Sequence, residues 1–404
     1  MSQKLENLKV NFSKESLGNM MEECQLPKEW KWVRLGEVIQ EALPGFACGK
    51  RAGSEGFIQL RMNNISGNGQ LNLSSVLRVP ATKEQIERYR LIPRDVIFNN
   101  TNSAELVGKT TLFDEINGIF LYSNHLTRLR PVFKVLESSY LALWLQLQWY
   151  LRIFERICNR WIGQAAVQRE KLLNLEIPLP CFSEQKRIAV KVKELMQEVE
   201  RARTACEKQL DTVKALLSAY LREVFESEEA KKWERKKLGE LCVFSSGKFL
   251  QKEEVKNKGL YPVYGANGVI GFTGEKIFDK EVIIIGRVGS CGTVNKTLGP
   301  AWITDNTIIL QMHYKIDFDY LYWLLRSLKL EDFRAASVQP LITQKDLKPL
   351  LVPIPSLSEQ KHIATKLKEK MEQIEKLRKT IEEQLDSINT LPQAILKKAF
   401  MGEL

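Results

Sequence analysis

The sequence predicts an α+β fold in which two globular domains of mixed strands and helices alternate with two long coiled-coil helices. Three observations lead to this prediction. One stretch of sequence is repeated along the chain, each copy carries a heptad pattern of apolar residues, and the segments between the copies alternate short β-like runs with turn residues. A chain of 404 residues is also long enough for two or three domains.

The repeat is the clearest feature of the chain. The string "IPLPCFSEQKRIAVKV" at 177–192 returns as "VPIPSLSEQKHIATKL" at 352–367, and the two copies align without a gap as far as Phe225 and Phe400. Because ungapped agreement over this length does not arise by chance, the chain carries an internal duplication, with a pseudo-twofold relation between its halves.

Each copy is predicted to begin as an extended segment and to continue as a helix. The prolines of "I-P-L-P" and "V-P-I-P" fix their own backbone and push the preceding residues toward extended conformations. Ser183 and Ser358 follow as predicted N-caps, because a serine side chain can accept a hydrogen bond from the first helical turn. The Glu-Gln pair after each serine suits the positive end of a helix.

Behind each predicted cap, apolar residues recur at alternating steps of three and four over about five heptads, which is typical of a coiled-coil seam. Two amphipathic helices packed on separate domains would be the alternative. Gln209 and Gln384 occupy the same predicted seam position and suggest a polar layer that sets the register. Pro392 is expected to kink or restart the second helix near 389–391. The predicted seam consists of Ile188, Val192, Leu195, Val199, Gln209, Leu216, Ile363, Leu367, Ile374, Leu377, Gln384 and Leu391.

The segments between the copies resemble each other loosely. Each starts with a tryptophan-containing run, "WKWVRLGEVI" or "WERKKLGELC", and closes with a predicted aromatic helix, "YLALWLQLQWYL" or "DYLYWLLRSL". In between, strand-like runs such as "RDVIFNNT" and "EVIIIGRVGS" are bounded by Gly and Asn turns. The order along the chain is therefore domain, long helix, domain, long helix.

The positive charge lies in the two globular segments. Residues 26–176 hold 20 Lys and Arg against 14 Asp and Glu, and residues 228–351 hold 19 against 15, so these segments carry +10 of the net charge of +11. Such an excess favours a polyanionic partner, above all nucleic acid, although it also serves solubility.

Other features limit the location of the protein and the cofactors that it can hold. Seven cysteines without a C-x-x-C pair and an N-terminus without an apolar signal core are typical of a cytoplasmic protein with reduced thiols. The longest apolar stretch, "YLALWLQLQWYLRIF", is interrupted by Gln and Arg and falls short of a membrane span. Three histidines far apart in the sequence make a His/Cys metal site an unfavourable interpretation.

Motifs of catalysis are missing from the sequence. Gly108-Lys109-Thr110 has the last residues of a phosphate-binding loop, but Ser103 stands where that loop needs its first glycine. The glycines of "GRVGSCG" do not follow the G-x-G-x-x-G spacing of a dinucleotide site. The Asn/Asp-Pro-Pro-aromatic tetrapeptide expected of an adenine methyltransferase does not occur, and no catalytic residue or metal ligand is predicted.

Polar residues in the turns of both domains are of the types that contact DNA. Arginine pairs with guanine and asparagine with adenine, while Lys, Ser and Thr bind phosphates. Asn and Gly are also ordinary turn residues, so each position has a purely structural alternative. The candidate DNA-binding residues are Arg61, Asn63, Asn64, Asn99, Asn100, Thr101, Asn102 and Lys109 in the first domain, and Lys248, Tyr264, Asn267, Arg287, Ser290, Thr304 and Asn306 in the second.

The paired "P-x-P-x-x-S-E-Q-x-x-I" strings, the long helices behind them and the closing "ILKKAFMGEL" resemble the specificity subunit of type I restriction-modification enzymes. The resemblance covers essentially residues 26–404. It implies an N-terminal extension at 1–25, target recognition domains at 26–176 and 228–351, and spacer helices at 177–227 and 352–404 that pack antiparallel.

The resemblance also implies a non-catalytic function. The chain would recognise a bipartite, asymmetric site on double-stranded DNA and direct adenine methylation and restriction by other subunits. Its partners would be two copies of a methyltransferase subunit and the restriction subunits, which use S-adenosylmethionine, ATP and Mg²⁺, while this chain binds no cofactor itself. Two other classes stay open at this point: a self-contained DNA methyltransferase or nuclease, and a coiled-coil scaffold without a role on DNA.

Overall fold

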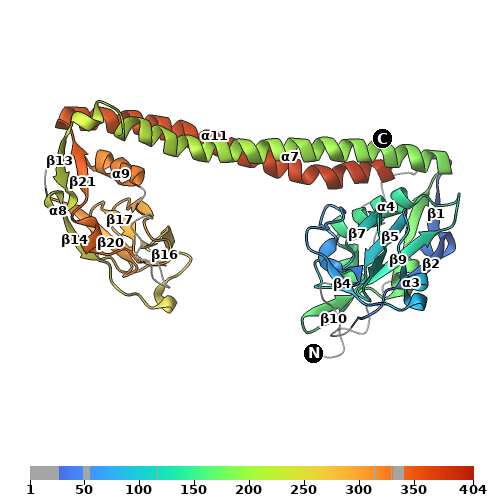
Figure 1. Ribbon diagram of the computed structural model, residues 1–404. Helices are drawn as coiled ribbons and strands as arrows, with labels where there is room; N and C mark the ends of the chain where they lie inside the picture. Colours follow the sequence, from blue (N-terminus) through green and yellow to red (C-terminus); the bar gives the residue numbers. More distant parts are fainter. Residues whose placement is uncertain (1–26, 49–54, 116, 314, 329, 331–340) are drawn as a thin grey trace. The chain divides into compact units, whose positions relative to one another are not determined.

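The computed structural model describes residues 27–48, 55–115, 117–313, 315–328, 330 and 341–404, so the predicted extension at 1–25 lies outside the described residues. The chain divides into two compact units (Figure 1). Unit 1 holds the chain up to Ala205 together with Leu385–Leu404, and unit 2 holds Cys206–Gln384. None of the helices in the described part of the chain is long and apolar enough to cross a membrane.

The globular part of unit 1 is built on a four-stranded antiparallel sheet, with a three-stranded sheet beside it in which β3 and β8 are parallel. The larger sheet has the order β2 (Ile39–Pro44), β9 (Leu126–Pro131), β5 (Asp95–Asn99), β7 (Thr110–Phe113), and the smaller one β4 (Leu77–Val79), β3 (Phe57–Leu60), β8 (Phe120–Tyr122). The remaining strands are β1 (Lys31–Arg34) paired with β12 (Glu176–Leu179), and the set β10 (Asn159–Trp161), β11 (Gln164–Ala166), β6 (Thr101–Asn102). The helices are α2 (Leu35–Val38), η2 (Met62–Asn64), α3 (Lys83–Tyr89), α4 (Ser138–Tyr150), α5 (Ile153–Ile157) and α6 (Arg169–Leu173).

Strand β5 shows how the layers of unit 1 are held together. All five of its residues are buried, and successive side chains point to opposite faces of the sheet. Val96 and Phe98 join a core with α4 and with the long-helix residues of this unit, whereas Ile97 joins a second core with residues of the three-stranded sheet. The four-stranded sheet is therefore the middle layer between the helices and the smaller sheet.

Unit 2 repeats this arrangement. Ile283 and Ile285 of its central strand face the helical core, and Ile284 between them faces the smaller sheet. The four-stranded sheet has the order β14 (Cys242–Ser246), β20 (Thr307–Met312), β17 (Ile283–Gly286), β18 (Val294–Lys296), and the three-stranded one β16 (Gly268–Thr273), β15 (Tyr261–Gly265), β19 (Trp302–Ile303). The other elements are β13 (Glu234–Lys237) paired with β21 (Leu351–Ile354), η3 (Ala230–Lys232), α8 (Leu238–Leu241), η4 (Lys252–Glu254), α9 (Phe318–Ser327) and α10 (Gln344–Leu347).

The α+β prediction and the two aromatic helices are confirmed. The aromatic runs form α4 and α9, each capped by an acidic side chain just before its first residue. Glu137 accepts a hydrogen bond from the backbone N–H of Tyr140 at 2.8 Å, and Asp317 accepts one from that of Tyr320 at 3.0 Å. The two caps occupy equivalent places, as the pseudo-twofold repeat predicts.

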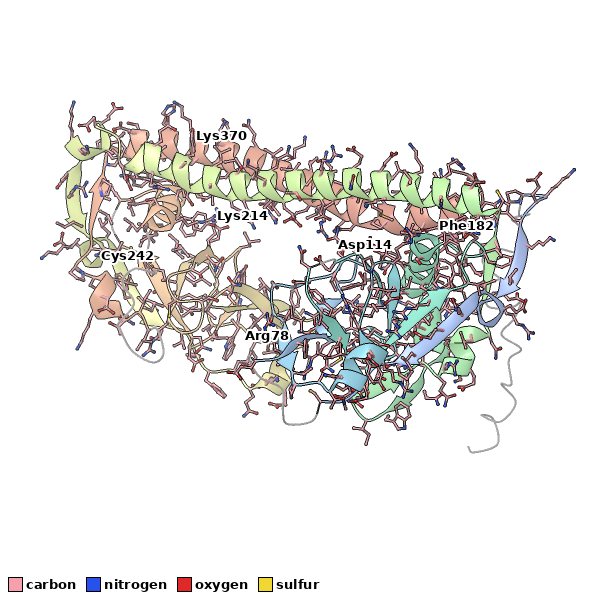
Figure 2. All side chains as sticks on the ribbon, turned by 45° about the vertical axis from the view of Figure 1, so that its right-hand side comes forward. Arg78, Asp114, Phe182, Lys214, Cys242 and Lys370 are labelled. Atoms are coloured by element: carbon pink, nitrogen blue, oxygen red, sulfur yellow. The ribbon has the colours of Figure 1, made fainter. Side chains whose placement is uncertain are left out.

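The repeated sequences form two 44-residue helices, α7 (Phe182–Phe225) and α11 (Leu357–Phe400), whose side chains are drawn in Figure 2. In unit 1 the end of α11 lies beside the beginning of α7, since Phe400 packs on Tyr140 at 4.8 Å between ring centres and shares a core with Ile188. In unit 2 the end of α7 lies beside the beginning of α11, where Phe225 packs on Tyr320 at 5.6 Å. The two helices are therefore antiparallel, as expected.

The glutamine of each S-E-Q string ties a long helix to its domain. Gln185 is fully buried; its Oε1 accepts the N–H of Glu137 at 2.8 Å, and its Nε2 donates to the carbonyls of Val135 and Pro180, both at 2.9 Å. Gln360 repeats the pattern with the N–H of Asp317 at 2.8 Å and the carbonyl of Pro355 at 2.9 Å. Duplication of the string therefore duplicates a structural joint between helix and domain.

Replacing Gln185 with Ala is expected to lower the stability of unit 1 by about 2 kcal/mol, because buried backbone groups lose their partners. Thermal unfolding should show a midpoint roughly 5 °C lower for the domain transition. Gln197→Ala, at an exposed position of the same helix, is the matched control and should leave the midpoint unchanged. Equal midpoints for Gln185→Ala and Gln197→Ala would contradict the assigned role.

The predicted seam is correct at Ile188, Val192, Leu367 and Ile374, which are buried, while Leu195, Val199 and Ile363 are half-buried. It is wrong at five positions that lie on the solvent side: Gln209, Leu216 (44% exposed), Leu377 (46%), Gln384 and Leu391 (42%). The buried face instead follows Cys206, Leu210, Val213 and Leu217 on α7, and Ala364, Leu367, Met371, Ile374 and Ile381 on α11.

The error has a physical cause. Residues spaced alternately three and four apart can be chosen in two ways along α7, and both choices include Cys206 and Val213. The predicted choice continues through Gln209 and Leu216, whereas the buried one continues through Leu210 and Leu217. Each helix must cover the aromatic helix of a domain as well as its partner helix, so the buried face is rotated from a simple two-helix seam. Arg203 on α7 and Arg378 on α11 are partly exposed and form ion pairs within their own helices, with Glu200 at 2.6 Å and Glu375 at 2.9 Å.

Two further expectations about the helices are wrong. The caps lie two residues before Ser183 and Ser358, because α7 starts at Phe182 and α11 at Leu357; Ser356 Oγ accepts the N–H of Glu359 at 3.3 Å. The second helix does not restart at Pro392 but continues through it to Phe400. Burial of the surrounding face, including Leu396 and Phe400, outweighs the one backbone hydrogen bond that the proline removes.

Candidate nucleic-acid interface

Four loops of unit 1 meet at one end of its sheets. The N–H of Ser123 donates to the carbonyl of Leu60 at 2.9 Å, joining the loop after β8 to the end of β3. The N–H of Asn100, after β5, donates to His125 at 3.0 Å, and the N–H of Phe46, after β2, donates to Tyr122 at 3.3 Å. We call residues 45–48, 61–64, 99–103 and 123–125 the first rim.

The equivalent loops of unit 2 are joined by the same bonds. Thr304 N–H donates to Tyr264, Arg287 N–H to Asn306 and Lys248 N–H to Ile303, each at 2.9 Å. Residues 247–249, 265–267, 286–290 and 304–306 form the second rim. The hydrogen-bond pattern thus pairs Ser123 with Thr304, Asn100 with Arg287, His125 with Asn306 and Phe46 with Lys248.

A glycine makes the closest approach possible in both rims. A Cβ atom on Gly45 would lie 2.2 Å from the carbonyl oxygen of Tyr122, and one on Gly247 would lie 2.1 Å from that of Thr304. We call residues 45–48 after β2 and 247–249 after β14 the strap of each rim. Any residue larger than glycine at these two positions would push the strap away from the neighbouring loop. The geometry of both rims therefore depends on glycine at this point.

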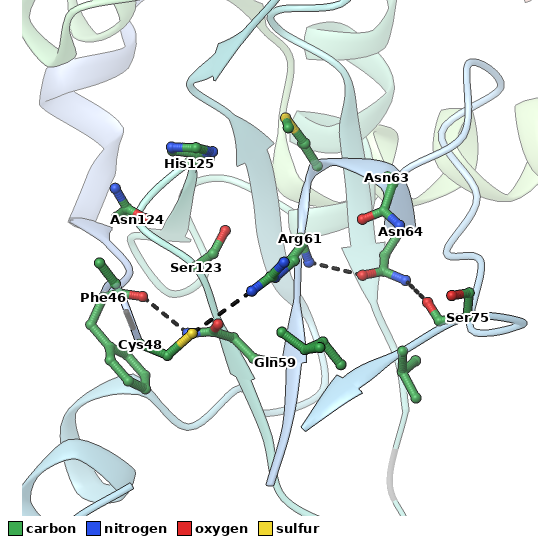
Figure 3. A pocket seen from close by; sticks show the side chains of 14 residues that line it. Phe46, Cys48, Gln59, Arg61, Asn63, Asn64, Ser75, Ser123, Asn124 and His125 are labelled. Atoms are coloured by element: carbon green, nitrogen blue, oxygen red, sulfur yellow. Dashed lines mark hydrogen bonds between the residues drawn. The ribbon is translucent and has the colours of Figure 1, made fainter. Parts of the chain in front are cut away.

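The first rim encloses a groove of about 560 Å³, shown in Figure 3. Arg61 and Asn63, both predicted, line it, and the guanidinium of Arg61 lies 3.7 Å from the Cys48 sulfur. Sequence reasoning missed five further polar residues of the lining: Gln59, Ser75, Ser123, Asn124 and His125. The polar string "SNH" between two buried strands was the signal that could have identified three of them.

The second rim exposes most of the predicted residues of its domain. Lys248, Asn267, Ser290 and Asn306 are exposed, and Arg287 is half-buried. Thr304 and Tyr264 are buried instead. Tyr264 belongs to β15, and its hydroxyl accepts the N–H of Leu298 at 3.3 Å. Tyr264 therefore packs inside the domain next to the rim, and the prediction that it contacts DNA is wrong.

Three predicted residues of the first domain are also buried. Asn64 donates to the carbonyls of Asn72 and Ser75, both at 2.9 Å, and so closes its own loop. Lys109 Nζ donates to the carbonyl of Ile65 at 2.5 Å, and burial lowers the pKa of its ammonium group. Asn99 is fully buried on β5. Asn64 and Lys109 therefore use their polar atoms within the fold and hold the loops that shape the groove, and Asn99 has no exposed surface.

The remaining predicted residues organise the rim while keeping part of their surface open. Asn100 Nδ2 donates to Thr127 Oγ1 at 2.8 Å and to the carbonyl of Asn124 at 3.2 Å, which fixes the loop that carries His125. Thr101 and Asn102 form the short strand β6 and are half-buried. The structure thus brings residues far apart in the sequence to one surface in each unit, with positive or amide side chains at its edge.

Comparison with known proteins gives a consistent result over most of the chain. The family model described as "Type I restriction modification DNA specificity domain" matches residues 27–206 and 230–387. A putative type I restriction enzyme MjaX specificity subunit from Methanocaldococcus jannaschii is 27% identical, covering 92% of this chain and 94% of that protein. The type I restriction enzyme EcoDI specificity subunit from Escherichia coli is 30% identical, covering 43% of this chain and 38% of that protein.

Two solved structures share the fold. A chain from a type I R-M system superimposes with a TM-score of 0.76 at 24% identity, covering 94% of this chain and all of its own length. The HsdS subunit from Thermoanaerobacter tengcongensis gives a TM-score of 0.57 at 23% identity, covering 94% of this chain and 98% of its own. At this level of identity the likeness supports the architecture rather than any single contact.

Proposed function

Because the chain belongs to the family of type I restriction-modification DNA specificity subunits, we propose that its two rims each recognise one half of a bipartite, asymmetric DNA target. The observation that carries this proposal is the pair of equivalent rims. The same backbone hydrogen bonds place loops at the same end of each domain, yet the side chains at matched positions differ, as with Asn100 and Arg287. Two domains with the same loop backbone but different side chains on its surface are suited to recognise two different DNA sequences.

The charge distribution supports DNA as the ligand. The excess of +10 lies in the two segments that carry the rims, whereas the segments with the long helices are close to neutral. A cationic surface attracts the phosphate backbone, and loops with Arg and Asn can then contact base edges. A coiled-coil scaffold without a DNA role would not account for this location of the charge.

We further propose that catalysis belongs to partner chains. The chain would direct adenine methylation by two copies of a methyltransferase subunit, and restriction by further subunits, with S-adenosylmethionine, ATP and Mg²⁺ bound by those partners. Each methyltransferase copy would bind an equivalent surface of the long helices, because the repeated sequence forms matching surfaces in both units. The cytoplasm, where the DNA lies, would be the place of action.

Co-expression of this chain with a methyltransferase subunit of a type I restriction-modification system from the same organism tests the proposal. Genomic adenine methylation is expected only when both chains are present, and the purified chain alone is expected not to bind radiolabelled S-adenosylmethionine. Sequence-specific methylation by the methyltransferase alone would remove the specificity role. Binding and transfer by this chain alone would instead favour a self-contained methyltransferase.

A further inference from the structure

One hydroxyl group occupies the same place in both rims. Ser123 and Thr304 each follow the last strand of the three-stranded sheet, and their N–H groups donate to Leu60 and Tyr264, both at 2.9 Å. Their carbonyls accept the N–H of the residue three positions later, Leu126 at 2.9 Å and Thr307 at 3.2 Å. Both side chains are only 8% exposed.

Neither hydroxyl has a hydrogen-bond partner among the described residues. Leaving a buried polar group unpaired costs about 1–3 kcal/mol, and an alanine or valine would fill either position without that cost. The penalty occurs twice, at matched positions of two domains. A hydroxyl kept at this cost in both rims points to a partner outside the chain.

The surroundings of each hydroxyl suit an anionic partner. Ser123 lines the groove of the first rim, which Arg61, Asn124 and His125 line with it (Figure 3). At the second rim the strap packed against Thr304 continues into Lys248, which is exposed. Each rim therefore combines one buried hydroxyl with cationic side chains, namely Arg61 in the first rim and Lys248 and Arg287 in the second.

We propose that Ser123 and Thr304 each donate a hydrogen bond to a phosphate of the DNA backbone, so that both half-sites are held by the same clamp. This inference rests on the proposed function and adds an anchor shared by both rims. The side chains at other matched positions differ, namely Phe46 and Lys248, Asn100 and Arg287, and His125 and Asn306. A contact common to two domains that read different sequences must fall on the part of DNA that is common to all sequences, which is the backbone.

The test uses the full chain in complex with its methyltransferase and two duplexes, one carrying the target found by methylation mapping and one of randomised sequence. Ser123→Ala and Thr304→Ala are each expected to weaken binding of both duplexes about tenfold, in line with one lost hydrogen bond to a charged group. The methylated motif should stay the same. The exchanges Ser123→Thr and Thr304→Ser keep a hydroxyl and should retain most of the affinity.

Salt dependence separates the hydroxyl from a cation. Because a hydroxyl displaces no counterion, Ser123→Ala should leave the slope of log K against log salt unchanged, whereas Arg61→Ala should reduce the slope by about 0.9 if it neutralises one phosphate. Thermal stability provides a further check, since removing an unpaired buried hydroxyl should not lower the unfolding temperature.

Several results would overturn the phosphate clamp. A change of the recognised base at one position would show that the hydroxyl contacts a base. Unchanged affinity, or a marked loss of thermal stability in Ser123→Ala, would remove the need for a DNA partner. If instead the wild-type complex fails to prefer its mapped target over the randomised duplex, the proposed function itself fails, and this outcome is separate from the other two.

Discussion

Replacing Leu367 with Asp is expected to destabilise unit 2 by about 4 kcal/mol or more, because a carboxylate would enter a fully apolar environment. Leu367 is completely buried on α11 in the core that includes Val213 of α7 and Trp323 of α9. Since domains of this size are stable by about 5–15 kcal/mol, the loss would remove about a quarter or more of the stability of unit 2 and should lower its urea midpoint markedly.

Leu377→Asp provides the matched control for this experiment. It introduces the same charge change on the same helix, ten residues further on, at a side chain that is 46% exposed. Its effect on stability should stay within about 0.5–1 kcal/mol. Urea unfolding followed by circular dichroism, together with gel filtration for aggregation, measures both variants. Equal losses for the two variants would mean that the buried face of α11 has been assigned to the wrong residues.

Lengthening both long helices by seven residues is expected to change the DNA target in a defined way. α7 and α11 each continue without a break from one unit into the other, so one added heptad lengthens each helix by about 10 Å. Cys206 and Ile381 are equivalent positions of the repeat, so insertion after both keeps its symmetry. An insertion of seven residues also keeps the phase of the buried face, because it adds one complete heptad.

With both insertions, the unread gap between the half-sites should grow by about three base pairs, while the half-sites stay the same. Three base pairs also turn the second half-site by roughly 100°, so a loss of affinity is expected alongside the longer gap. Methylation mapping of cells that carry the lengthened chain and its methyltransferase measures both. An active enzyme with an unchanged gap would show that the helices do not set the spacing. A heptad inserted into α7 alone should abolish activity, because it breaks the pairing.

The architecture could be predicted because its signals are local and repeated. The duplicated S-E-Q string, the heptads and the aromatic helices are each visible within a short window, and the structure confirms the helices. The function of Gln185 and Gln360 was hidden, because their partners, the backbone groups before α4 and α9, are some forty to fifty residues earlier in the chain. Only the fold brings them together.

The errors arose where burial depends on neighbours distant in sequence. Leu216 and Leu391 fit a coiled-coil pattern, but the domain helices rotate the buried face toward Leu217 and Leu396. Asn99 and Lys109 are of residue types that contact bases and phosphates, yet one lies on a buried strand and the other reaches the carbonyl of Ile65. Ser123 escaped notice because a single serine between strands carries no signal by itself.

The central claim is that each rim reads its own half of one DNA target. Mapping of methylated adenines in cells that express the methyltransferase with either the wild-type chain or the Arg287→Ala variant tests it most directly. The wild-type chain should give two short motifs separated by a fixed gap. Arg287→Ala should relax or change only one motif, with a loss of about 1–3 kcal/mol at the affected base pair, and should leave the other motif and the gap intact. A uniform weakening of both motifs, or a single continuous motif in the wild type, would contradict the claim.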